Sequence, residues 1–408
     1  MTTAPQIRFF DRTTPPHVAT LVLLAGIPAL NMSIFLPSLT RMADFFQTDY
    51  ATMQFAVSGY LAATAVLQII VGPLSDRFGR RRLMLVSLVV FIAATIGALF
   101  STSIAAFLGF RILQAVVATG IVLSRAIVRD IYPPDESASK IGYVTMGMAV
   151  IPMIGPTIGG ILDQAFGWQS SFVFLSLAGA LVFVFVLFDQ GETGQPGGIT
   201  FADQLKGYPD LLRAPRFWGY ALCAAFASGS FFAFLGGAAF VADTIYGLSP
   251  MLTGAALGAP AIGYALGNFL TGRYAVRYGI DRMTVVGCII GIAGLAVSLA
   301  LSVAGYNSAW LFFGFSTCLG LGNGLTLPNA TAGLLSVRPH LAGTASGLGG
   351  ALMIGGGAAL SQFAGTLLDV ESGTVALQAL MLVSMVLGLA SIMVVLWRSR
   401  QLARRRKA

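Results

Sequence analysis

The sequence predicts an all-α membrane protein whose twelve transmembrane helices form two pseudo-symmetric six-helix bundles. The first observation is composition: 56% of the 408 residues are hydrophobic and 10% are charged, whereas about a quarter of a soluble domain is charged. The second is that apolar runs of about 20 residues, long enough to cross a bilayer, recur along the chain. The third is a charged stretch in the first half that reappears in the second.

The apolar runs and the polar gaps between them predict twelve spans. In chain order these are residues 18–39, 51–74, 83–101, 104–126, 139–163, 170–189, 216–240, 251–272, 283–304, 309–330, 341–366 and 375–397. The longest polar interval, 190–215, is rich in Gly and Pro and suits a linker with one short amphipathic helix. We therefore expect an N-terminal bundle over 1–189, a cytoplasmic linker over 190–215, and a C-terminal bundle with a basic tail over 216–408.

The basic residues predict the orientation. Apart from Arg41 and Arg111, the Lys and Arg residues lie at or beside the N-terminus, the gaps after even-numbered spans, the linker and the C-terminal tail. Short loops rich in Lys and Arg stay cytoplasmic, so both termini are expected in the cytoplasm. A formal charge of +8 does not suggest a nucleic-acid partner here, because such proteins carry a basic face on a soluble fold.

The two halves carry a related turn. The stretch GRYAVRYGIDRM at 272–283 aligns with GPLSDRFGRRRL at 72–83, and each follows the second span of its half. Two six-span halves in the same orientation are parallel repeats, an architecture typical of secondary transporters.

The first turn has a physical logic of its own. Gly72 lets helices approach closely, and Gly79 permits a tight reversal. Asp76 is an acid among arginines that can pair with a cation or with the positive N-terminus of another helix. A loop that merely sets topology is the alternative, although such a loop does not require Asp76.

This turn resembles the signature loop of the major facilitator superfamily, G-x-L-x-D-R-x-G-R-R. The matching residues are Gly72, Leu74, Asp76, Arg77, Gly79, Arg80 and Arg81. The resemblance implies the major facilitator fold. It also implies that Asp76 faces the start of span eleven, near 342–344, and an arginine of span four, either Arg125 or Arg129. That contact would latch the cytoplasmic side in the outward-open state.

Spans four and five carry further motifs. In span four, Arg111 and Gln114 resemble the family's R-x-x-Q-G motif. A buried Arg costs at least about 2.5 kcal/mol, so it should face an interior cavity with partners unless it snorkels to the surface.

In span five, Gly155, Pro156, Gly159 and Gly160 resemble the antiporter motif G-P-x-x-G-G. We expect Pro156 to bend the helix and the glycines to pack across the interface between the halves; ordinary helix packing is the alternative.

Within the superfamily the chain is most similar to the bicyclomycin and chloramphenicol resistance-like drug–proton antiporters. This implies a monomeric exporter in the bacterial inner membrane, coupled to the proton gradient without a cofactor.

One position departs from the group: Ser33 stands where relatives carry an acid before Pro37. Asn31 and Ser33 can hydrogen-bond Arg111 but cannot take up a proton near neutral pH. Either an acid at a span end carries the proton, with Asp163 and Asp44 as the leading candidates, or coupling is weak or absent.

A central cavity can be sketched from polar, aromatic and Met residues within the spans. Such surfaces suit a lipophilic, weakly polar compound, although each residue has core or lipid-facing packing as its alternative. The candidates are Asn31, Ser33, Phe35, Gln114, Met146, Met153, Phe231, Phe232, Tyr264, Asn268 and Asn323.

Three other functions are alternatives to drug export. Transport of one metabolite or siderophore, in either direction, stays open. A membrane enzyme needs a nucleophile, paired carboxylates or a metal cluster, and the sequence shows no such motif. A non-transporting sensor usually appends a soluble domain.

Overall fold

The computed structural model describes residues 8–132, 140, 144, 151, 154–194, 209–338, 341–369 and 373–405. Every regular element in these ranges is helical, and nine of the helices there are long and apolar enough to cross a membrane. Met146, Met153, the first part of predicted span five and linker residues 195–208 lie outside the described ranges.

The N-terminal half comprises the helices before the linker. They are α1 (Val18–Ser33), η1 (Leu36–Ser38), α2 (Leu39–Phe45), α3 (Tyr50–Met53), α4 (Phe55–Phe78), α5 (Arg80–Leu99), α6 (Ile104–Gln114), η2 (Ala115–Ala118), α7 (Thr119–Ile131), the helical residues 154–166 of span five, and α9 (Gln169–Asp189).

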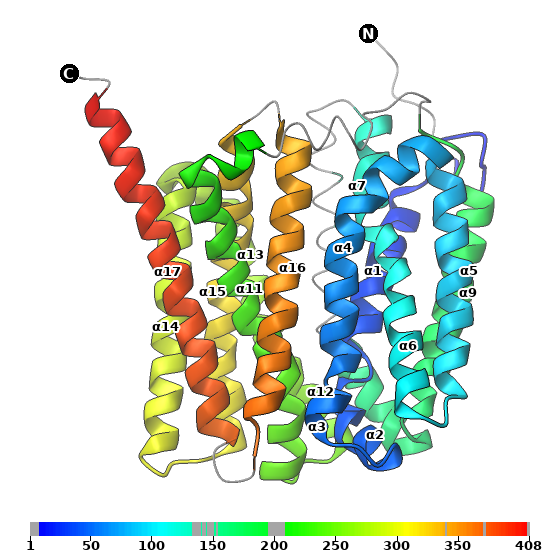
Figure 1. Ribbon diagram of the computed structural model, residues 1–408, viewed down its shortest axis with the longest axis horizontal. Helices are drawn as coiled ribbons and strands as arrows, with labels where there is room; N and C mark the ends of the chain where they lie inside the picture. The colour runs from blue at the N-terminus through cyan, green and yellow to red at the C-terminus, as the bar shows by residue number, and fades with distance from the viewer. Residues whose placement is uncertain are drawn as a thin grey trace.

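The C-terminal half repeats this plan. Its elements are α11 (Pro215–Phe240), the π-helix η3 (Val241–Ile245), α12 (Pro250–Leu257), α13 (Ala259–Tyr278), α14 (Ile280–Val303), α15 (Ala309–Ser336), α16 (Ala342–Leu367) and α17 (Gly373–Arg405). Helices α13 and α16 occupy predicted spans eight and eleven. Figure 1 shows the halves side by side, with both chain termini at the same end and α2, α3 and α12 at the opposite end. We call that opposite end the outer end.

The first span is broken where proline interrupts it. Helix α1 ends at Ser33, and the short η1 that follows has Pro37 at its start. A proline disfavours helical geometry in the residue before it and removes a backbone donor. The break brings the backbone of Ile34 against span five, where a Cβ added at Gly159 would collide with the Ile34 carbonyl oxygen.

Small residues let other helices approach backbone to backbone. Added Cβ atoms at Gly320 and Gly263, on α15 and α13, would collide with the carbonyls of Pro260 and Thr317. Helices in lipid associate through such small-residue contacts. The close approach predicted at Gly72 is not seen among the described residues: no described atom lies within 4 Å of a Cβ added there.

The repeated turn adopts the same conformation in both halves. Helix α4 ends at Phe78 and α13 at Tyr278, and a glycine with positive φ follows each: Gly79 with φ 87° and ψ 144°, Gly279 with φ 85° and ψ 150°. Residues with a Cβ rarely adopt this geometry, so the reversal expected from Gly79 is present twice.

We expect Gly79→Ala to destabilise the protein more than Gly279→Ala. Both variants carry backbone strain of about 1–3 kcal/mol. At Gly79 the new Cβ would also lie 2.5 Å from Oε2 of Glu192, whose Oε1 accepts the Arg80 backbone N–H at 2.8 Å. At Gly279 no described atom lies within 4 Å. Thermal unfolding in detergent measures both variants, and a wild-type melting temperature for Gly279→Ala would contradict the strain argument.

Candidate functional site

Arg111 of α6 is fully buried, at 0% exposure, and its partners are neutral. Its Nε donates to the carbonyl oxygen of Ala56 at 3.1 Å, and Nη1 donates to Asn31 Oδ1 at 2.8 Å. Nη1 also donates to Gln114 Oε1, and Nη2 to the Asn31 carbonyl at 3.4 Å. These acceptors replace water around the guanidinium, and no carboxylate among the described residues pairs with it.

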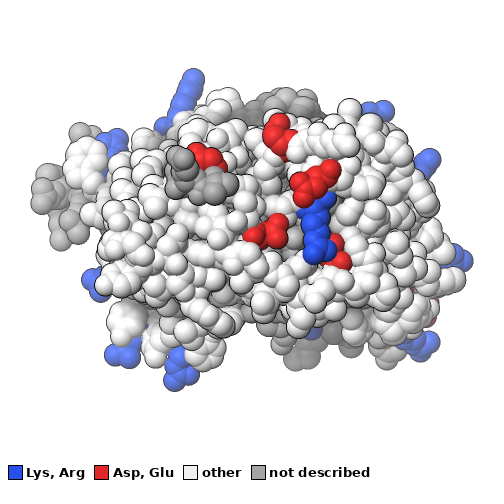
Figure 2. Space-filling view, turned by 90° about the horizontal axis from the view of Figure 1, so that it is seen from below, with Lys and Arg blue, Asp and Glu red and all other residues white. Residues whose placement is uncertain are grey.

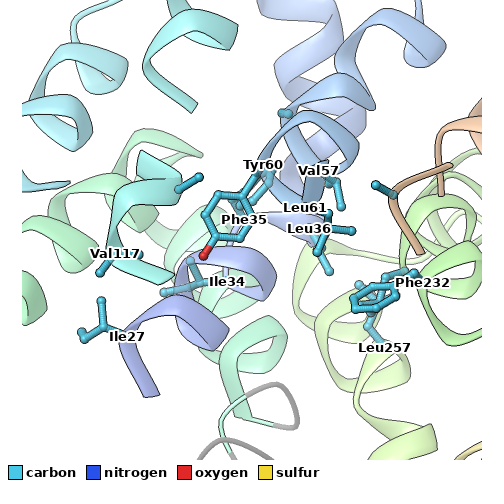
Figure 3. Packing of buried hydrophobic residues seen from close by; sticks show 14 of the residues in the cluster. Ile27, Ile34, Phe35, Leu36, Val57, Tyr60, Leu61, Val117, Phe232 and Leu257 are labelled. Carbon is cyan, nitrogen blue, oxygen red and sulfur yellow. The ribbon is translucent and has the colours of Figure 1, made fainter. Parts of the chain in front are cut away.

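Aromatic rings complete the arginine site. The guanidinium carbon lies 4.2 Å from the ring centroid of Phe35 and 5.1 Å from that of Tyr60, within the range of cation–π attraction. Figure 3 shows these two rings beside each other, among the side chains of α1, α4 and η2. The Tyr60 hydroxyl donates to the Pro28 carbonyl at 3.0 Å, and Gln114 Nε2 donates to Thr95 Oγ1 at 2.7 Å. The site therefore ties α1, α4, α5 and α6 together.

Ser33 does not join this site. Its hydroxyl donates to the Ala29 carbonyl at 2.9 Å, and a Cβ added at Gly155 would lie 2.5 Å from Ser33 Oγ. Of the two side chains considered as partners of Arg111, Asn31 binds the guanidinium and Ser33 faces span five. The reason is the rotation of α1, which turns position 31 toward α6.

The cytoplasmic turn forms its own charge network. Asp76 lies 3.3 Å from Arg80 Nη2, Arg80 Nε pairs with Asp130, and Arg80 Nη1 donates to Ser75 Oγ at 3.0 Å. Asp130 was not among the predicted site residues, although an acid directly after Arg129 at the cytoplasmic end of span four could have indicated an ion pair there. Arg129 and Arg77 are exposed.

The expected latch partners of Asp76 are not all described. The side chains of residues 342 and 343, at the start of α16, lie outside the described residues. Arg125 is close enough to Tyr264 of α13 for an electrostatic interaction across the halves. The structure thus groups Asp76 with Arg80 and Asp130, and Arg125 with Tyr264.

The remaining cavity candidates lie on C-terminal helices. Phe232 of α11 packs against Gly357 of α16, and Phe231 is half-buried beside it. Asn268 Nδ2 donates to the Tyr264 carbonyl at 2.8 Å. Asn323 of α15 is buried, and its Oδ1 accepts no hydrogen bond from a described residue. Asn31, Phe35 and Gln114 gather instead around Arg111.

Hydrogen bonds join the two halves at the outer end. The Tyr50 hydroxyl donates to the Gly236 carbonyl at 2.8 Å, and Gln54 Nε2 donates to Ser361 Oγ at 2.8 Å. Ser58 Oγ donates to Gln362 Oε1 at 2.6 Å, and Gln362 Nε2 donates to the Ala51 carbonyl at 3.1 Å. We call this set the outer interface. Sequence reasoning missed it, although Gln54 and Gln362 are polar residues at the outer ends of apolar spans.

The residues of the glycine motif in span five contact two different neighbours. A Cβ added at Gly254 of α12 would collide with the Pro156 carbonyl, and one added at Gly160 would collide with the carbonyl of Pro250. Pro156 and Gly160 therefore pack across the halves, as expected. Gly155 and Gly159 pack instead on span one of their own half, because they lie on the face of span five turned toward the break at Ile34.

Charged groups also meet at the outer end. Arg41 Nη1 lies 3.6 Å from Oδ2 of the buried Asp163, and the Thr40 hydroxyl donates to Asp243 of η3. Asp44, the other acid considered as a proton carrier, is exposed. Figure 2 views this end and shows acidic groups gathered around a basic group within the face.

We expect Arg111→Ala to lower the free energy of unfolding by about 3 kcal/mol or more, since each buried acceptor left without its donor costs roughly 1–3 kcal/mol. The matched control is Arg82→Ala, which removes an exposed arginine from the cytoplasmic turn. Thermal unfolding in detergent should separate the two; equal melting temperatures would show that the buried network is not stabilising.

Comparison with known proteins agrees with this architecture. The chain is 29% identical over 376 residues to the uncharacterized MFS-type transporter YdgK of Bacillus subtilis, covering 90% of this chain and 92% of the relative. It is 29% identical to a chloramphenicol resistance protein of Pseudomonas aeruginosa, covering 82% of each. It is 27% identical to multidrug resistance protein D of Escherichia coli, covering 88% of this chain and 90% of the relative.

A solved structure has the same fold. It is a bacterial homolog of the human lysosomal transporter Spinster in an inward-facing and occupied conformation, with a TM-score of 0.72 and 18% identity over 94% of this chain and 96% of that chain. Residues 21–362 match the family described as Major Facilitator Superfamily. The predicted fold and family resemblance are confirmed: this multi-pass membrane protein belongs to the Major Facilitator Superfamily.

Proposed function

We propose that this protein exports small amphipathic compounds, including antibiotics, by alternating access between the two halves. The observation that carries the proposal is the outer interface, where Tyr50, Gln54, Ser58 and Gln362 hold the halves together through neutral hydrogen bonds. Each such bond contributes only about 0.5–1.5 kcal/mol net, because water can replace the partner. Several such bonds together hold the outer side closed, and breaking them requires little free energy.

The substrate class follows from the relatives and from the chemistry of the interior. Chloramphenicol and multidrug resistance proteins are similar over most of both chains. The candidate cavity residues are aromatic or neutral and polar, which favours lipophilic compounds over sugars and anions. We infer a monomer in the bacterial inner membrane, with both termini in the cytoplasm by the distribution of Lys and Arg. When the outer side opens, Asp76 serves as the cytoplasmic latch.

Proton antiport supplies the driving force in this proposal and needs no cofactor. The N-terminal half cannot bind the proton beside Arg111, because Asn31 and Gln114 are amides that do not titrate. The transported proton must therefore bind elsewhere in the chain.

Drug susceptibility tests the proposed function. In a host lacking its own exporters, expression should raise the inhibitory concentration of chloramphenicol-like compounds several-fold, and a protonophore should remove the protection. Uptake of a nutrient without drug protection would contradict export, and protection that survives the protonophore would contradict proton coupling.

We expect Asn31→Asp to increase the pH dependence of transport more than Ser33→Asp. The new carboxylate at position 31 would face Arg111 Nη1, where Asn31 Oδ1 now lies at 2.8 Å, whereas Ser33 points to Ala29. Initial efflux rates from vesicles over a range of pH values measure the effect. An unchanged pH profile in both variants would place the coupling site away from α1.

A further inference from the structure

A buried carboxylate at the outer end is incompletely hydrogen-bonded. Asp163 is 2% exposed, and neither of its carboxylate oxygens accepts a hydrogen bond from a described residue. Its ion pair is with Arg41, at 3.6 Å, and the buried Ser38 hydroxyl of η1 faces the same group. Burying an ionised carboxylate without hydrogen bonds is unfavourable, so this site favours an added proton.

A second carboxylate approaches from the other half. Asp243 lies on the π-helix η3, accepts the Thr40 hydroxyl, and interacts electrostatically with Asp163. Irregular π-helical turns occur frequently at functional sites. The two acids come from opposite halves, so their separation depends on whether the outer side is closed.

The charges around this pair do not balance. Asp163 faces one guanidinium, Arg41, whose side chain is 49% exposed. Asp243 adds a second carboxylate to this cluster, so the ionised cluster carries a net charge of −1. Tyr50 also faces Asp243, but its hydroxyl is neutral and donates to Gly236. When two carboxylates approach each other, one of them tends to bind a proton.

Other acids at this end are placed differently. Asp44 of α2 is exposed. Asp49 is the N-cap of α3, and hydrogen bonds from the backbone and side chain of Thr52 hold the pKa of its carboxyl below its usual value. Asp49 therefore stays ionised in mildly acidic medium.

We propose that Asp163, with Asp243 of the other half in the same cluster, binds one proton from the external solution when the outer side closes. The proton moves from the external water to a carboxylate oxygen on closure and returns to the external water on reopening, so it regulates the outer side and is distinct from the proton that antiport carries to the cytoplasm. An acidic exterior thereby favours the outward-closed state, which resets an exporter after it has released its substrate. This inference rests on the alternating-access function proposed above and adds the group through which external protons act on the outer interface.

Labelling of a buried cysteine tests the proposal in intact cells. The reporter is Ser361→Cys, since Ser361 is 0% exposed at the outer interface, with a membrane-impermeant maleimide added outside. Rates are normalised to Tyr306→Cys, because Tyr306 is 67% exposed and its replacement corrects for the pH dependence of the thiol reaction. Acidifying the medium from neutral pH should slow labelling of Ser361→Cys several-fold.

Charge variants in the reporter background identify the groups. Asp163→Asn or Asp243→Asn should give slow labelling at both pH values, because the closed cluster is then neutral without a proton. Arg41→Gln should label faster than the reporter alone at neutral pH, because closure buries two unbalanced carboxylates. The matched control Asp44→Asn should keep the normal response.

The outcomes separate the inference from the proposed function. A normal pH response in both Asp163→Asn and Asp243→Asn would overturn the proton site at Asp163. Loss of the response in Asp44→Asn as well would also overturn it. If one of the two Asn variants fails to fold, the other decides. A drug panel without protection, together with pH-dependent labelling, would reject export but support the proton site. Drug protection together with pH-independent labelling would support export and reject the proton site.

Discussion

The lipid bilayer imposes the constraint on which this structure depends: backbone polar groups have no water to bind, so the chain must cross as hydrogen-bonded helices. Helices that satisfy their own backbones have few means of recognising one another. In this protein, glycines at the contact points let the backbones of neighbouring helices touch, as at Gly159 against Ile34 and Gly254 against Pro156. A small number of polar side chains between the helices provide the other contacts.

Those polar side chains serve two different purposes. Around Arg111 they form a sealed network within one half, where each acceptor is needed because an unpaired buried group is costly. At the outer interface they bridge the two halves through neutral groups such as Gln54 and Ser361. The first arrangement joins α1, α4, α5 and α6 within one half, and the second joins the two halves through bonds in which water can replace either partner.

The missing acid at Ser33 changes where protons can act. A carboxylate beside Arg111 would combine charge balance and proton binding at one place in the N-terminal half. In this chain amide oxygens and aromatic rings stabilise the arginine, and two acids from different halves, Asp163 and Asp243, stand at the outer end. In the proposed mechanism, proton binding therefore lies at the interface between the halves rather than beside Arg111.

The sequence by itself determined the helical membrane fold, the family and the glycine reversals at Gly79 and Gly279, because these depend on composition, period and local backbone geometry. Tertiary structure alone decided that Asn31 rather than Ser33 binds Arg111, that Glu192 caps α5, and that Asp243 meets Asp163. Hydropathy predicts that a segment crosses the membrane but leaves the rotation of each helix undetermined. Packing of the neighbouring helices sets that rotation, and with it the partner of each polar side chain.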